Sequence, residues 1–111
     1  MRGQQEFERV PFRRLRPVRR RDAMEKLQLE PAGTSASLAP MRVRIEVHQG
    51  RNSTASTMRA YRVMQEVEGV GGLASIIELT AGGSALMAQV NGEQAEHLAH
   101  SPFVRRIVTM S

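Results

Sequence analysis

Residues 41–48, MRVRIEVH, alternate apolar and polar side chains without a break. The apolar set is Met41, Val43, Ile45 and Val47, and the polar set is Arg42, Arg44, Glu46 and His48. Because successive side chains of a strand point to opposite faces of a sheet, this pattern predicts a strand with one buried face. The fold must therefore contain a sheet that covers a core with one of its sides.

The chain after this strand divides into five further predicted elements. Ala60, Val63 and Val67 recur at helical spacing, and Asn91 with Gln94 three residues later has the sequence of a helix capping box. Two short apolar segments separated by TAGG are typical of a hairpin. The predicted elements are a helix over 52–69, strands over 73–79 and 84–90, a helix that begins after Asn91, and a strand over 103–110.

This order of strand, helix, strand, strand, helix and strand predicts the ferredoxin-like βαββαβ fold, of the α+β class. Right-handed crossovers place both helices on one face of an antiparallel sheet whose central strands are the first and the third. The other face is then open, and its side chains are candidates for binding a partner. We expect there Arg42, Arg44, Glu46, Met87 and Gln89, together with His48, Ala85 and, from the second strand, Ile76.

The positive charge of the chain is concentrated before residue 41. Residues 1–40 carry nine basic side chains against five acidic ones, whereas residues 41–111 carry seven against six. The segment RVPFRRLRPVRRR (9–21) has seven arginines and two prolines, which favours an extended arm able to bind phosphates or acidic protein surface; an unstructured, solvated tail is the alternative. The candidate binding residues are Arg13, Arg14, Arg16, Arg19, Arg20 and Arg21.

The remainder of the first 40 residues predicts a short helix and a linker. DAMEKLQLE (22–30) has Asp22 as an N-cap candidate with Glu25 three residues later, which indicates about two turns of helix. PAGTSASLAP (31–40) is small, polar and bracketed by prolines, as linkers are. We therefore expect an arm and linker over 1–40 and a folded domain over 41–111.

The sequence predicts no catalytic site, cofactor or metal. A Ser-His-Asp set would need Asp22, the only aspartate, and His97 with His100 lacks a third ligand. GVGG (69–72) follows a helix, where turn chemistry explains it, and so lacks the context of a phosphate loop. With no membrane-spanning apolar run and no secretory signal in the sequence, we expect no membrane partner and a cytoplasmic product by default.

The stretch GGSALMAQVNGEQAEHLAHSPFVRRIV (82–108) resembles the C-terminal half of the subtilase propeptide and peptidase-inhibitor family. In that family a strand of the type G-F-A-A-x-L precedes S-x-E-Q-x-E-x-L and then P-x-V-x-x-V. With the preceding strand and helix included, the resemblance covers residues 41–110. The matching positions are Ala85, Leu86, Ala88, Val90, Glu93, Gln94, Ala95, Leu98, Pro102, Val104 and Ile107.

The resemblance implies a module that lays its open sheet face on a subtilisin-like serine protease and passes its C-terminal tail through the substrate cleft. Such a module acts as an inhibitor or as a folding chaperone, here in trans. The tail would consist of Val108, Thr109, Met110 and Ser111, with Val108 standing where the family usually has an acidic residue.

Two other functions use the arginines of the arm. One is a component that binds nucleic acid by its phosphates, with affinity that falls steeply as salt rises. Base readout is disfavoured there, because Arg44 and Met87 stand where stacking aromatic rings would be needed. The other is a subunit of a large assembly whose arm binds in a neighbouring subunit's groove.

Overall fold

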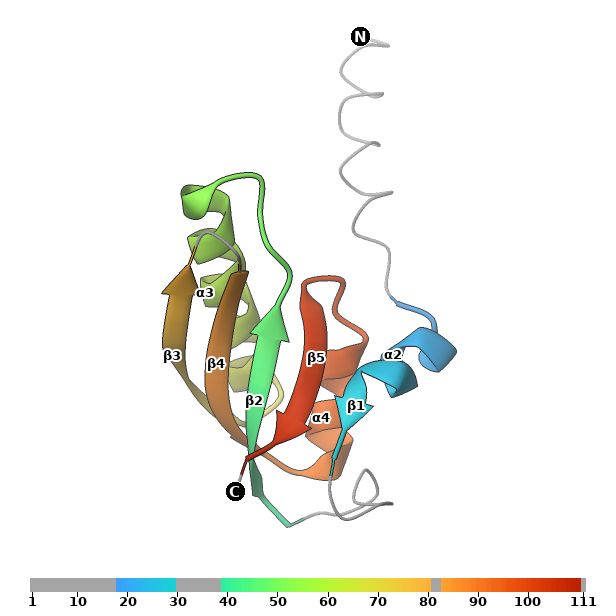
Figure 1. Cartoon of the computed structure of the whole chain (residues 1–111). Coiled ribbons are helices and arrows are strands. Elements are labelled where there is room, and N and C mark those ends of the chain that lie inside the picture. The colour runs from blue at the N-terminus through green and yellow to red at the C-terminus, as the bar shows by residue number, and fades with distance from the viewer. Residues whose placement is uncertain (1–17, 30–38, 81–82, 111) are drawn as a thin grey trace, which may run out of the picture.

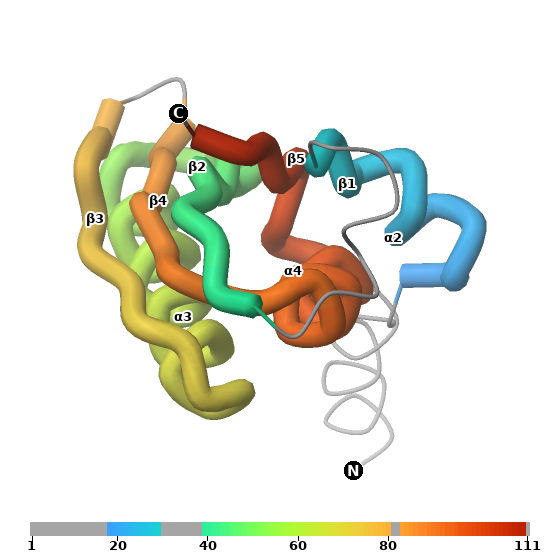
Figure 2. The backbone as a smooth tube through the Cα atoms, turned by 90° about the horizontal axis from the view of Figure 1, so that it is seen from below, coloured from blue at the N-terminus to red at the C-terminus, as the bar shows by residue number. Residues whose placement is uncertain are grey.

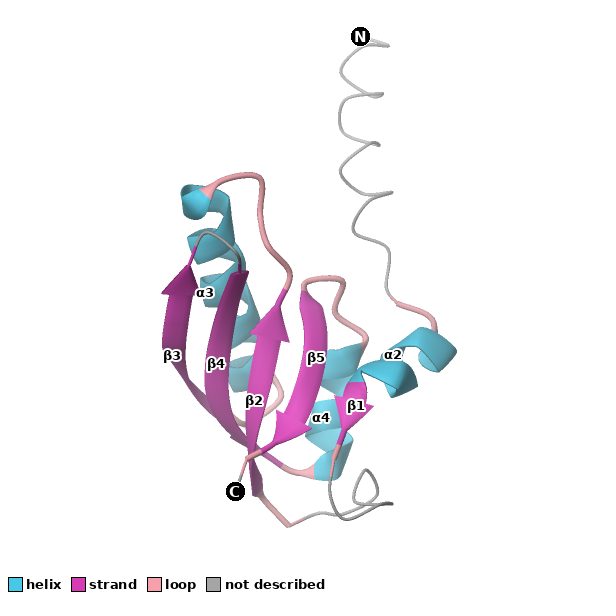
Figure 3. Cartoon of the chain, in the orientation of Figure 1, coloured by secondary structure: helices cyan, strands magenta, loops and turns pink. Residues whose placement is uncertain are grey.

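The computed structural model describes residues 18–29, 39–80 and 83–110. In these ranges the chain forms three helices and five strands (Figures 1 and 3). In chain order they are α2 (Arg20–Lys26), β1 (Leu27–Gln28), β2 (Met41–Val47), α3 (Ser53–Gly69), β3 (Leu73–Thr80), β4 (Gly83–Val90), α4 (Gly92–Ala99) and β5 (Val104–Thr109). None of the described helices has the length and apolar character that crossing a bilayer requires.

The five strands form one mixed sheet in the order β1-β5-β2-β4-β3. β2 pairs antiparallel with β4 and β5, β3 pairs antiparallel with β4, and β1 pairs parallel with β5. The predicted α+β class is confirmed, as is the pairing of β2 with β4. The prediction of a purely antiparallel sheet with two helices is wrong, because residues 20–28 add a third helix and a parallel edge strand.

Residues 18–29, which lie within the predicted arm and linker of 1–40, therefore pack against the folded domain. Ala23 of α2 is fully buried in the same core as the strands, and Leu27 of β1 pairs with Ile107 of β5. The ammonium group of Lys26 donates to the carbonyl oxygen of Ser101 at 3.0 Å. Burial and strand pairing, rather than local sequence, thus fix residues 18–29.

The short helix begins earlier than the sequence predicts. α2 covers Arg20–Lys26 with Arg19 at the N-cap and no side-chain capping bond, so Asp22 lies in the first turn instead of capping. The expected helical residues 27 and 28 are strand, because they pair with β5. Residues 1–17, with most of the arginine-rich segment 9–21, and most of the predicted linker lie outside the described residues.

The core lies between the sheet and the helices α3 and α4. Figures 1 and 2 show both helices on the same side of the strands. The core residues, all nearly inaccessible to solvent, are Val43, Ile45, Val47, Leu86, Ala88, Val90, Ala60, Val63, Val67, Ala95, Leu98, Ala99, Val104 and Ile107. The alternation predicted for β2 is confirmed, because every second residue from Val43 is buried.

Both α3 and α4 begin with an asparagine cap, and the capping box predicted at Asn91 and Gln94 is confirmed. The Asn52 side chain accepts from the backbone N–H of Ala55 at 2.8 Å at the start of α3. At the start of α4, Asn91 and Gln94 exchange two hydrogen bonds of 2.7 and 2.8 Å, which is a complete capping box. Gln94 also donates to the carbonyl oxygen of Val70 at 2.8 Å, so the cap of α4 fastens the end of α3 as well.

Candidate protein-binding site on the open sheet face

The face of the sheet opposite α3 and α4 is covered by no described helix (Figure 1). The strand registers arrange its side chains in three rows that run across the sheet. The first row contains Arg42, Gln89 and Leu73; the second contains Gln28, Val108, Arg44, Met87 and Ser75; the third contains Arg106, Glu46, Ala85 and Glu78. Six of the eight residues expected on this face lie in these rows, namely Arg42, Arg44, Glu46, Ala85, Met87 and Gln89.

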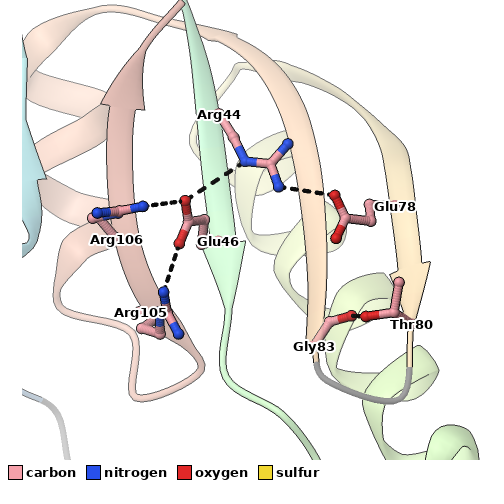
Figure 4. Close-up of polar contacts among 7 residues, drawn as sticks. All are labelled: Arg44, Glu46, Glu78, Thr80, Gly83, Arg105 and Arg106. Carbon is pink, nitrogen blue, oxygen red and sulfur yellow. Dashed lines mark hydrogen bonds and ion pairs between the residues drawn. The ribbon is translucent and has the colours of Figure 1, made fainter.

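Glu46, in the third row, is the centre of a network of ion pairs on this face (Figure 4). One carboxylate oxygen of Glu46 accepts from Arg106 at 2.7 Å and the other accepts from Arg105 at 3.0 Å. Arg44 approaches Glu46 at 3.6 Å through Nε and donates to Glu78 at 2.9 Å through Nη2. Three strands, β3, β2 and β5, are thus linked across the face by charged side chains.

The environment of Glu46 favours its charged form. Burial of this carboxyl would raise its pKa, but the hydrogen bond from Arg106 and the nearby charges of Arg106, Arg105 and Arg44 outweigh that effect and lower the pKa. The hydrogen bond to Glu78 is the main reason why the pKa of Arg44 is raised. The charged carboxylate of Glu46 therefore holds its arginine partners in place.

The first two rows contain fewer charged side chains than the third row, and the apolar side chains of the face lie mainly in them. Val108, Arg44, Met87 and Ser75 lie side by side on four neighbouring strands. Beside Met87, a shallow hollow of about 160 Å³ is lined by Leu73, Ala74, Ser75, Met87 and Gln89. The open face therefore has an apolar and amide-rich half next to a charged half.

One residue expected on the open face lies on the other side. Ile76 pairs with Leu86 and packs against the core. The register of β3 shifts between Ile76 and Glu78, so Ile77 is an inserted residue and Glu78, instead of Ile77, joins the open face. His48 follows the end of β2, and its backbone N–H donates to the carbonyl oxygen of Phe103 at 2.9 Å.

The C-terminal residues expected to form a tail are largely part of the sheet. Val108 and Thr109 belong to β5, opposite Arg44 and Val43 of β2. The backbone N–H of Met110 donates to the carbonyl oxygen of Arg42 at 2.9 Å. Ser111 lies outside the described residues. Residues 108 and 109 therefore belong to the predicted strand over 103–110, and a role of residues 108–111 in binding a partner stays a prediction.

The arginines predicted to bind phosphate or acidic surface are only partly described. Arg19, Arg20 and Arg21 are exposed around the start of α2, and none of the three forms an ion pair within the described ranges. Arg13, Arg14 and Arg16 lie outside the described residues. α2 contacts α4 and β5, so the three described arginines lie at the β1 edge of the sheet and apart from the ion-pair network (Figure 2).

Sequence reasoning missed Glu78, Arg105 and Arg106 as members of the face. Period-two counting from Leu73 and Ser75 places Ile77 on the open face and Glu78 on the core side, and only the inserted residue brings Glu78 to the open face. A second register shift, between Glu46 and Val47, brings both consecutive arginines of β5 within reach of Glu46. The adjacent arginine pair in an otherwise apolar strand was the available signal.

The histidines do not form a metal site within the described part of the chain. No group of three or more histidine and carboxylate side chains is close enough there to hold an ion. The ring nitrogen Nδ1 of His100 lies 2.9 Å from the carbonyl oxygen of Val18, while His97 is exposed. His100 thus fastens the start of the described N-terminal segment to the end of α4.

Comparison of the chain with protein-family models, with curated proteins and with solved structures found no match in any of the three. The resemblance to subtilase propeptides therefore remains a prediction from residues 82–108.

Proposed function

We propose that this chain is a non-enzymatic protein-binding module that docks on its partner through the open sheet face. The observation that carries the proposal is the preorganised face itself, in which Glu46 fixes Arg44, Arg105 and Arg106 beside the apolar surface around Met87. A binding surface whose side chains are already held loses less conformational entropy on association. Apolar contact surrounded by arginine is also typical of protein interfaces.

The partner that fits the resemblance is a subtilisin-like serine protease, which the module would inhibit or help to fold. Strands β2 to β5 support this proposal through their order β5-β2-β4-β3 with α3 and α4 on one side, which is the ferredoxin-like arrangement of such propeptides. Because Val108 and Thr109 are paired in the sheet, docking would depend on the open face rather than on these two residues.

An inhibition assay of the full chain against a panel of subtilisin-like proteases tests the proposal. Met87→Lys places a charge in the middle of the face, and Met58→Lys makes the same change on the exposed surface of α3. We expect Met87→Lys to weaken inhibition about tenfold or more, and Met58→Lys to leave it within about twofold. If the chain neither inhibits nor binds any protease of the panel, the protease assignment fails.

The exposed arginines before and within α2 favour a second candidate function. Arg19, Arg20 and Arg21 are consecutive, solvent-accessible and free of ion pairs with other described residues, so they are available for an anionic partner. The partner would be nucleic acid or an acidic surface on a neighbouring subunit of a large assembly. Filter binding of RNA and DNA at rising salt, measured for the wild-type chain and for the variant Arg19→Ser/Arg20→Ser/Arg21→Ser, tests this function. If the wild-type chain binds neither at the lowest salt, nucleic acid is excluded as the partner.

A further inference from the structure

The two edges of the sheet differ in length. At one edge β1 has only two residues, and α2 precedes it directly. At the other edge β3 has eight residues, Leu73–Thr80, and pairs with β4 on one side only within the described chain. A strand of eight residues is roughly 26 Å long, so this edge presents a long row of backbone donors and acceptors.

β3 carries few of the features that keep edge strands apart. It contains no proline and no lysine, and its only charge, Glu78, is hydrogen-bonded to Arg44 of the same chain at 2.9 Å. The apolar side chains of Leu73, Ile77 and Leu79 are 69%, 45% and 48% exposed. The single register shift next to Ile77 is the one protective irregularity in β3.

We propose that β3 pairs antiparallel with β3 of a second copy of this chain, which joins the two sheets into one. The position of Glu78, the single charged residue of β3, is compatible with this pairing because it lies away from the centre of the strand. If the two copies meet around Ile76 and Ile77, Glu78 of each copy faces the neighbourhood of Ser75 in the other, so like charges do not oppose each other. The same exposed apolar side chains then contribute from both copies, as a two-fold interface requires.

The pairing has a consequence for the open face. A two-fold axis between antiparallel edge strands runs perpendicular to the sheet, so both open faces lie on the same side of the dimer. Glu46, its arginine partners and Met87 lie on β2, β4 and β5 and are not used at the edge. The dimer would therefore present two copies of the open face to a partner, and the inference holds whether or not that partner is a protease.

Sedimentation equilibrium of the full chain tests the dimer, over concentrations from about 5 to about 200 µM, the range in which a modest interface associates. Ile77→Lys adds a charge at the centre of the edge, and Met58→Lys is the matched control because Met58, on α3, is already 68% exposed. We expect Ile77→Lys to raise the dimer dissociation constant about tenfold or more and Met58→Lys to change it less than about twofold. Circular dichroism verifies that each variant is folded.

Hydrogen exchange of the wild-type chain is a second test of the proposed dimer, and it needs no substitution. At high concentration the amides of residues 73–80 should exchange more slowly than at low concentration, while those of β1 should not change. A wild-type chain that stays monomeric over the whole range overturns the proposal. So does a dimer whose protected amides lie outside residues 73–80, because another surface would then form the contact.

Discussion

Replacing Glu46 by glutamine should destabilise the folded chain, because its carboxylate organises the charged half of the open face. The Glu46 side chain is only 15% exposed, while its three arginine partners are between 35% and 58% exposed. A hydrogen bond to a charged group contributes about 1.5–3 kcal/mol and an exposed ion pair about 0.2–1 kcal/mol. Taking the lower values because solvent screens these pairs, the loss of the Arg106, Arg105 and Arg44 contacts lowers the free energy of unfolding by about 2 kcal/mol.

The effect of Glu46→Gln should depend on pH. The pKa of Glu46 is lowered in the folded chain, so the unfolded chain takes up this proton at a higher pH. The stabilisation is complete above the ordinary glutamate pKa of about 4.3 and is lost as the pH falls through the lowered folded-state value. The difference in unfolding free energy between wild type and Glu46→Gln should therefore shrink in acid, as measured by urea unfolding followed by circular dichroism.

Glu78→Gln is the matched control for this measurement. Glu78 forms one exposed pair with Arg44, so its loss should cost only about 0.5 kcal/mol. Equal losses for Glu46→Gln and Glu78→Gln would refute the central position given to Glu46. If the difference in unfolding free energy between wild type and Glu46→Gln stays the same as the pH is lowered, the charge of the Glu46 carboxylate is not the cause of the stabilisation.

Three further changes test the packing of the body. Gly72→Ala should lower the free energy of unfolding by about 1–3 kcal/mol, because a Cβ at Gly72 would lie 2.7 Å from Cγ1 of Val90. Asn91→Ala should lower it by about 1 kcal/mol through loss of the capping box, and thermal unfolding measures both. Ala23→Asp buries a charge beneath α2 and should therefore speed trypsin cleavage at 19–26. Met24→Asp, at an exposed position of the same helix, should leave the cleavage rate unchanged. Equal cleavage rates of the two variants would show that α2 is not docked.

The strand β2 could be predicted because its two faces have different surroundings. Val43 and Ile45 lie on the face covered by the helices, and Arg42 and Arg44 lie on the face that no helix covers. The alternation of apolar and polar residues in the sequence therefore follows directly from the alternation of buried and open faces. The helix caps at Asn52 and Asn91 could be predicted for a similar reason, since each depends on bonds within a few residues. Local rules are sufficient where the stabilising contact is local.

The parts that could not be predicted depend on contacts distant in sequence. Leu27 is strand because it pairs with Ile107, and no local pattern in residues 22–30 indicates that partner. The inserted residue Ile77 changes the phase of β3 and brings Glu78 to the open face, while Ile76, which precedes it, lies on the core side with Ala74. The network around Glu46 is therefore visible only once the registers of β3 and β5 are known.

Methionine methyl NMR tests the docking role of the open face most directly. Of the seven methionines in the chain, Met87 lies on the open face and Met58 on the exposed surface of α3, so one sample reports on both. On titration with a subtilisin-like protease that the chain inhibits, the Met87 methyl signal should shift or broaden while that of Met58 keeps its position. A change at Met58 with none at Met87 would contradict docking through the open face.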